Sequence, residues 1–165
     1  MSKSNYIAIQ KYNTAEEWGK LKWQELVMEN GKTVLPPNAP GLYRLILKKN
    51  RETMNFGSVV VCEKAEAKLC CDNIFTIDNE VVLSIGKTTK LRTRLSQHFG
   101  NNEKSNRLKK RCQQFFDLQD VSLDNLAESN MYLQYAVVYN WWERDLLESY
   151  GKAVCCCLFD LEIEH

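Results

Sequence analysis

The chain has 165 residues, 44% hydrophobic and 26% charged, a composition typical of one compact globular domain, or of a small domain with one insertion. The formal net charge of only +1 excludes any argument about partners from overall charge. No apolar run approaches the roughly 20 residues that span a bilayer, and the N-terminus lacks the apolar segment of a secretory signal. We therefore expect a cytoplasmic protein with no membrane partner.

Residues 1–40 are expected to form a helical extension and a connector. Thr14 and Glu17 fit a capping box, and apolar residues follow at helical spacing as far as a predicted stop at Gly31. The segment VLPPNAPG holds all 3 prolines of the chain, so it predicts an extended connector without regular structure.

Residues 41–165 are expected to form the main domain, with an insertion at about 50–78. Composition and turn signals predict strands over 41–49, 57–63 and 131–139, and a hairpin over 74–86 that turns at Asp78-Asn79. Helices are predicted from Thr88 or Thr89 to Phe99, over 103–117, and from Asn140 to about Gly151. This order predicts an α/β (α+β) fold with a small, mainly antiparallel, three-stranded central sheet flanked by helices.

The cysteines do not have the spacing of a disulfide framework or of a zinc site. Of the 7 cysteines, several stand in adjacent runs at 70–71 and 155–157, which do not pair cleanly. No C-x₂-C pair is matched by a second pair or by spaced histidines. We expect reduced thiols that are mostly buried as small apolar groups.

Gly86-Lys87-Thr88 follows a predicted strand and raises the question of a phosphate-binding loop. A Walker-type loop needs a glycine five residues before this glycine, but that position is Val81, and residues 82–85 continue the strand. The sequence therefore disfavours a nucleotide-binding loop. What remains is the N-terminus of a helix, whose free amides would favour an anion.

The segment from Lys87 to Arg111 is strongly basic, because Glu103 is its only acid. Such a segment is either the footprint of a polyanion site or a solvated helix face, and both interpretations stay open on charge alone. Within it, Lys90, Arg94 and His98 share one helical face, where arginine can stabilise negative charge and histidine can move a proton.

These residues resemble the motifs of the GIY-YIG nucleases. Gly41-Leu42-Tyr43 is similar to the first half-motif, and Ser84-Ile85-Gly86 stands where the second belongs, directly before the helix KTTKLRTRLSQH. Arg94 matches the catalytic arginine of the family and His98 the histidine found in many members. Glu148, in ERDLLESYG, matches the glutamate that holds a metal. The resemblance covers residues 41–160 and departs from the pattern at Ser84, where the family has tyrosine, and at Asp160, where asparagine is usual.

The resemblance implies a metal-dependent DNA endonuclease, either of restriction type or a structure-specific repair enzyme. In that function Tyr43 would be the general base, with its pKa lowered by the neighbouring Lys87. Arg94 would neutralise charge in the transition state, and His98 would support Tyr43 or the phosphate. The cofactor would be a divalent ion, Mg²⁺ or Mn²⁺, held by Glu148 and the phosphate itself.

Further residues are expected to contact DNA. Those expected at the backbone phosphates and the scissile site are Ser84, Lys90, Arg92, Lys104, Arg107, Lys109, Lys110 and Arg111. Amides that can reach base edges are those of Asn101, Asn102, Asn106 and Gln113. Trp141 and Trp142 are expected in the core, with stacking of one of them on an unpaired base as the alternative.

Two other functions stay open. In the first, Ser84 marks the loss of activity, and the chain is a catalytically weakened GIY-YIG-like DNA-binding module. In the second, the chain is an interaction domain unrelated to DNA. A homodimer also stays open, because restriction-type enzymes often dimerise to cut two strands. The sequence likewise leaves open whether the substrate is DNA or RNA and which site is cut.

Overall fold

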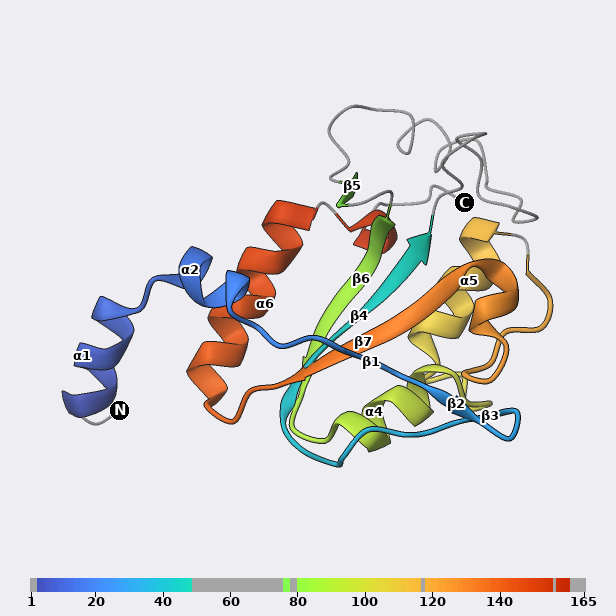
Figure 1. The fold of residues 1–165 in the computed structure, drawn as a ribbon, viewed down its shortest axis with the longest axis horizontal. Helices are drawn as coiled ribbons and strands as arrows, with labels where there is room; N and C mark the ends of the chain where they lie inside the picture. Colours follow the sequence, from blue (N-terminus) through green and yellow to red (C-terminus); the bar gives the residue numbers. More distant parts are fainter. Residues whose placement is uncertain (1–2, 49–75, 78–79, 117, 156, 161–165) are drawn as a thin grey trace.

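A five-stranded antiparallel sheet with the order β1-β7-β4-β6-β5 organises the molecule (Figure 1). The computed structural model describes residues 3–48, 76–77, 80–116, 118–155 and 157–160. The long strands are β4 (Gly41–Lys48), β6 (Glu80–Thr88) and β7 (Met131–Val137), and short edge strands are β1 (Gln24–Glu25) and β5 (Thr76–Ile77). The predicted α+β fold, with three central antiparallel strands, is confirmed.

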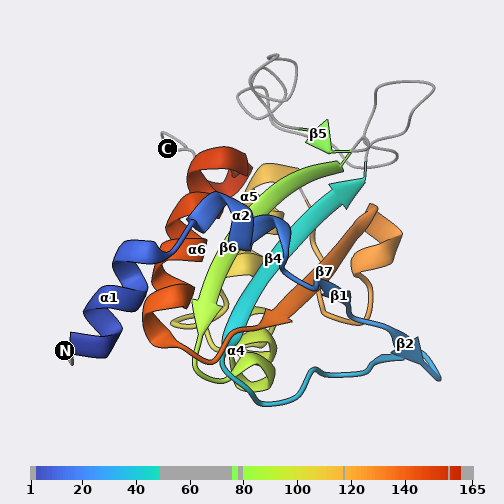
Figure 2. The ribbon, with the colours of Figure 1, turned by 60° about the vertical axis from the view of Figure 1, so that its left-hand side comes forward.

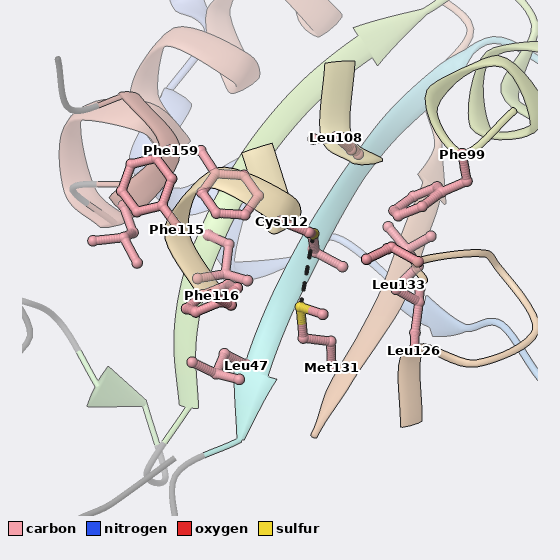
Figure 3. Packing of buried hydrophobic residues seen from close by; sticks show 14 of the residues in the cluster. Leu47, Phe99, Leu108, Cys112, Phe115, Phe116, Leu126, Met131, Leu133 and Phe159 are labelled. Atoms are coloured by element: carbon pink, nitrogen blue, oxygen red, sulfur yellow. Dashed lines mark hydrogen bonds between the residues drawn. The ribbon is translucent and has the colours of Figure 1, made fainter. Parts of the chain in front are cut away.

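One face of the sheet packs against α4 (Leu91–His98), α5 (Arg107–Phe116), and the 3-10 helices η1 (Leu126–Ser129) and η2 (Leu158–Asp160). Alternation along β4 directs Tyr43, Leu45 and Leu47 to this face, where they join the largest hydrophobic cluster. Figure 3 shows the phenylalanines of α5 and η2 in contact and the Cys112 thiol against the Met131 sulfur, 3.9 Å away.

The other face is covered by α6 (Trp141–Cys155) and by the N-terminal segment that follows α2 (Thr14–Gly19), whereas α1 (Lys3–Lys11) lies on the side of α6 that faces away from the sheet (Figure 2). Gly151 lies inside α6, and the position requires glycine because a Cβ there would overlap the ring of Trp18. The prediction that this helix ends near Gly151 is therefore wrong: the glycine admits the Trp18 ring, and α6 continues to Cys155.

The prediction of one N-terminal helix reaching Gly31 is also wrong. Helix α2 ends at Gly19, and the chain then forms β1 and a hairpin of β2 (Met28–Glu29) and β3 (Lys32–Thr33). Asn30 and Gly31 form the turn with φ of 52° and 74°. Asn-Gly between two short strands is a strong hairpin signal, and it outweighed the helical spacing of the apolar residues. The extension therefore contributes β1 to the main sheet.

The strands β4, β6 and β7 and the helices α4 and α5 agree with the prediction within a few residues at their ends, whereas α1, η1 and η2 were not predicted. The predicted strand 57–63 and the Asp78-Asn79 turn lie outside the described residues, as does nearly all of the predicted insertion. Among the residues that the structure describes, Cys112, Cys155 and Cys157 are buried, as expected, and burial raises the pKa of the Cys112 thiol to about 12. No helix in the described part of the chain is long and apolar enough to cross a bilayer.

Candidate active site

A pocket of about 180 Å³ lies at the outer edge of β6. The described part of β5 pairs only with Glu80 and Val81, so the rest of this edge has no described strand partner. The walls of the pocket come from β4, β6 and α4, from α5 and α6, and from η2, and thus from both layers around the sheet. Its lining residues are Tyr43, Ser84, Ile85, Gly86, Lys87, Arg94, His98, Arg107, Leu108, Glu148, Lys152 and Asp160. All five residues predicted to be catalytic line this one pocket.

Tyr43 reaches the pocket by lying across Gly86. The two residues are paired neighbours on β4 and β6, and a Cβ at position 86 would overlap Cζ and Oη of the Tyr43 ring. The glycine therefore leaves the space through which the phenol extends. At its end, Tyr43 Oη lies 2.7 Å from His98 Nε2 in a buried hydrogen bond.

The pKa of Tyr43 is raised, and the prediction that Lys87 lowers it is wrong. Burial of the phenol raises its pKa most, while the hydrogen bond and charge of Arg94 oppose that rise. Lys87 extends toward α6, where its Nζ lies 2.8 Å from Asp145 Oδ1. Arg94 on α4 is therefore the main cation that acts on Tyr43, and Arg107 adds a smaller effect.

His98 is a neutral imidazole in this site. Its side chain is 2% exposed, and burial, followed by the charges of Arg94 and Arg107, lowers its pKa to about 3. Its Nδ1 is buried and has no hydrogen-bond partner among the described residues. We assign the proton to Nε2, because the opposite tautomer would bury an unpaired N–H donor, which is rarer than an unpaired acceptor. Nε2–H then donates to Tyr43 Oη.

The low pKa of His98 predicts a loss of stability in acid. An unfolded histidine binds a proton near pH 6.5, whereas the folded one stays neutral down to about pH 3. This contribution to stability is therefore complete above pH 6.5 and falls by about 1.4 kcal/mol per pH unit below it. Urea unfolding of the wild type and of His98→Gln between pH 7 and 4 measures it, with the variant expected to have the shallower dependence. Parallel pH dependences would contradict the neutral, buried imidazole.

The charges around the pocket favour an anion. Four cationic side chains line it, from Lys87, Arg94, Arg107 and Lys152, against the carboxylates of Glu148 and Asp160. Sequence reasoning did not assign Lys152 to the site and expected Arg107 only at flanking phosphates. The spacing of Lys152, four residues after Glu148 on one helix, was the signal that could have found it.

Glu148 fits a metal site of the kind that is completed by a substrate. Its side chain is 15% exposed, and its Oε1 lies 3.5 Å from Lys152 Nζ and 3.8 Å from Lys87 Nζ. The described residues hold no group of three or more metal-binding side chains. Mg²⁺ is commonly bound by one or two carboxylates together with waters and substrate phosphate, so Glu148 alone suffices as a protein ligand there. Before Glu148 could bind a metal ion, the ammonium groups of Lys87 and Lys152 would have to move away from its Oε1.

The N-terminus of α4 does not offer the anion site that the sequence predicts. The connector occupies it: Leu91 N donates to Ala39 O at 3.0 Å, and Thr93 N donates to Asn38 Oδ1 at 3.2 Å. The predicted cap at Thr88 or Thr89 is also wrong, since α4 begins after Lys90, whose amide donates to the Thr88 hydroxyl. The extended, proline-rich connector thus caps the helix and takes the amides of Leu91 and Thr93.

Two of the predicted DNA-binding cations on α4 lie outside the pocket. Arg92 donates from Nε to Pro36 O at 3.0 Å and fastens the connector, while Lys90 is exposed at the start of the helix. Neither belongs to the pocket lining, whereas Ser84 does. The shared helical face of Lys90, Arg94 and His98 thus contributes only its last two members to the pocket.

A basic groove of about 440 Å³ runs along α5. It is lined by Glu103, Lys104, Arg107, Lys110, Arg111 and Gln114. Arg107 also lines the pocket at β6, so the two hollows are neighbours that share this side chain as a wall. Lys109 is absent from the groove lining and donates to Asn101 Oδ1 at 3.3 Å.

The amides expected at base edges are mostly engaged within the protein. Asn106 is buried, which contradicts its predicted reach to DNA. Gln113 Nε2 donates to Gln119 O, and Asn102 Oδ1 accepts from the Lys104 amide. They act in local structure at the two ends of α5.

The candidate site is therefore a cationic pocket lined by one buried phenol, one neutral imidazole and the carboxylates of Glu148 and Asp160. Its chemistry has to be argued from these residues. Neither protein-family models, nor curated proteins, nor solved structures give a match to this chain.

Proposed function

We propose that the protein is a metal-dependent DNA endonuclease of the GIY-YIG type, which hydrolyses phosphodiester bonds in the pocket at the edge of β6. The observation that carries this proposal is the convergence of Tyr43, Lys87, Arg94, His98 and Glu148 on one pocket. They come from four separate elements, and the resemblance had assigned a role to each. A structural role alone would not require them to meet.

Arg94 and Tyr43 have the central roles in the proposed reaction. Hydrolysis needs a water made nucleophilic and relief of the charge that grows on the phosphoryl oxygens. Tyr43 would act in its phenolate form, stabilised by Arg94 and by the Nε2–H of His98, and would become a neutral phenol when it takes the proton of the water. The burial that raises the pKa of Tyr43 also makes this Arg94 contact stronger than it would be in water.

The other cations would hold the phosphate. Lys152, Lys87 and Arg107 line the same pocket, so a phosphodiester would enter a surplus of positive charge. In exchange, the two lysines that lie near Glu148 Oε1 would turn to phosphate oxygens and free that carboxylate. A divalent ion bound by Glu148 and the phosphate would supply further positive charge for the transition state.

The groove along α5 would carry phosphates beyond the scissile one. Replacing Lys110, which lines it, with alanine is expected to reduce the slope of log K against log salt by about 1. Lys109→Ala is the matched control, because Lys109 is adjacent on α5 and lies outside the groove lining, so its slope should stay close to the wild type. Fluorescence anisotropy with a labelled duplex in EDTA measures both slopes. Equal slopes for the two variants would remove the groove from the DNA path.

A second candidate function is a DNA-binding module without strong catalysis. Ser84 lines the pocket where the family motif has a tyrosine, and the Glu148 carboxylate lies near two lysine ammonium groups. Both features would weaken catalysis while leaving the cationic pocket and groove able to bind DNA.

Nicking of a supercoiled plasmid tests the proposed function. The wild type is expected to convert it to open-circular and linear forms with Mg²⁺ or Mn²⁺ and to be inactive in EDTA. Binding without nicking under any of these conditions would favour the DNA-binding module. Absence of both binding and nicking would leave the interaction domain.

A further inference from the structure

Three large apolar side chains are exposed where β7 ends, in the short connection that follows it, and where α6 begins. Val137, Tyr139 and Trp141 are 36%, 75% and 54% exposed. The expectation that Trp141 lies in the core is therefore wrong. Its neighbour Trp142 turns the other way on α6 and meets Tyr12 edge-on, with ring centroids 5.1 Å apart.

Trp141 lies on the same stripe of α6 as the candidate active site. Trp141, Asp145, Glu148 and Lys152 follow at spacings of four, three and four residues, which places them on one helical face. Seven residues separate Trp141 from Glu148, about 10 Å along the helix axis. Lys87 Nζ connects the stripe to β6, at 2.8 Å from Asp145 Oδ1 and 3.8 Å from Glu148 Oε1.

The charges next to Trp141 do not suit a phosphate. Glu143 and Asp145 lie on the first turns of α6, Lys87 of β6 is paired with Asp145, and the buried Arg144 donates to Val138 O and Tyr139 O. An uncharged planar group would not meet this repulsion, and the faces of Trp and Tyr rings stack on nucleobases of any sequence. In a paired duplex the base faces are already stacked on one another, so an unpaired base fits these rings better.

We propose that Trp141 forms a stacking platform for unpaired nucleobases of the strand whose phosphate occupies the pocket. This inference rests on the proposed nuclease function and narrows its substrate. The preferred DNA would carry unpaired nucleotides beside the scissile phosphate, as in a flap or a frayed end. A phosphate in the pocket and a base on Trp141 would be held by opposite ends of one stripe on α6.

The test compares two labelled DNAs that share one duplex sequence, one fully paired and one with a single-stranded flap. Binding is measured by anisotropy in EDTA for the wild type, Trp141→Ala and Trp141→Phe. Trp141→Ala is expected to bind the flap DNA about tenfold more weakly and the paired duplex within about twofold of the wild type. Trp141→Phe should retain most of the affinity for the flap DNA, because it keeps an aromatic face.

Val27→Ala is the matched control, since Val27 is an apolar side chain with 55% exposure that lies away from α6, and it should change neither affinity. Equal losses on both DNAs, or no loss on either, would overturn the stacking platform while wild-type binding and nicking kept the nuclease proposal intact. A wild type that binds neither DNA would overturn both. Light scattering gives a further outcome. If Trp141→Ala converts a dimer to a monomer and leaves the preference for the flap DNA unchanged, the surface around Trp141 is an interface between copies of the chain, and the proposed stacking of bases is wrong.

Discussion

Replacing Arg94 with alanine is expected to reduce the rate of phosphodiester cleavage about a thousand-fold. Arg94 lines the pocket and is the cation whose hydrogen bond and charge lower the pKa of the buried Tyr43. Its loss would raise the pKa of the phenol further and would leave the charge on the phosphoryl oxygens less neutralised. Both effects act on the same step, so we expect a large loss of rate with a smaller loss of DNA affinity.

Single-turnover cleavage of a labelled duplex at saturating enzyme measures this loss. Arg92→Ala is the matched control, because Arg92 lies on the same helix but donates to Pro36 O outside the pocket. We expect it to cut at a rate within about threefold of the wild type, because it removes no charge from the pocket. Similar losses in the two variants would mean that Arg94 acts through general attraction of DNA, and the assigned role would be wrong.

Replacing Gly86 with alanine is expected to destabilise the protein by about 2 kcal/mol and to remove activity. The new Cβ would overlap the Tyr43 ring, which could then no longer lie across β6 and reach His98. The Tyr43 ring is 5% exposed and hydrogen-bonded to His98, so moving it aside would break that bond. Urea unfolding gives the change in stability, and the nicking assay gives the loss of activity.

Two further variants separate the overlap from a general effect of alanine. Gly19→Ala introduces a Cβ with no atom within 4 Å and is expected to be neutral or slightly stabilising. Tyr43→Leu shortens the side chain, so the double variant with Gly86→Ala should lose less stability than the sum of the two single changes. Additive losses would show that Gly86 is needed for a reason other than the Tyr43 ring.

Local patterns in the sequence predict the fold well because each central strand and helix carries its own period and end signals. The β-branched and aliphatic run of β6, the charged face of α5 and the apolar spacing of α4 all agree with the packing. The meeting of Tyr43, Arg94, His98 and Glu148 in one pocket could be predicted because these residues match the family motifs in the same order along the chain. The hairpin of β2 and β3 was missed, although Asn30-Gly31 is a strong signal, because helical spacing of nearby apolar residues competed with it.

The environment of the site residues depends on contacts that local patterns do not contain. Lys87 pairs with Asp145, which is 58 positions away, and so does not act on Tyr43 as predicted. The direction of the pKa shift of Tyr43 depends on its burial under α4, which outweighs the charge of Arg94. The first backbone amides of α4 donate to Asn38 and Ala39 of the connector. The prolines of the connector predict an extended chain but not these hydrogen bonds.

Glu148→Gln provides the most direct measurement for the proposed nuclease site. The substitution keeps the size of the side chain and removes the charge that would hold a divalent ion beside the phosphate. We predict that the variant binds duplex DNA in EDTA at least as tightly as the wild type, since a negative charge is removed from a cationic pocket. With Mg²⁺, its single-turnover cleavage should fall by at least a hundred-fold. Cleavage by Glu148→Gln at the wild-type rate, with the same dependence on Mg²⁺, would contradict the assignment of this pocket as the active site.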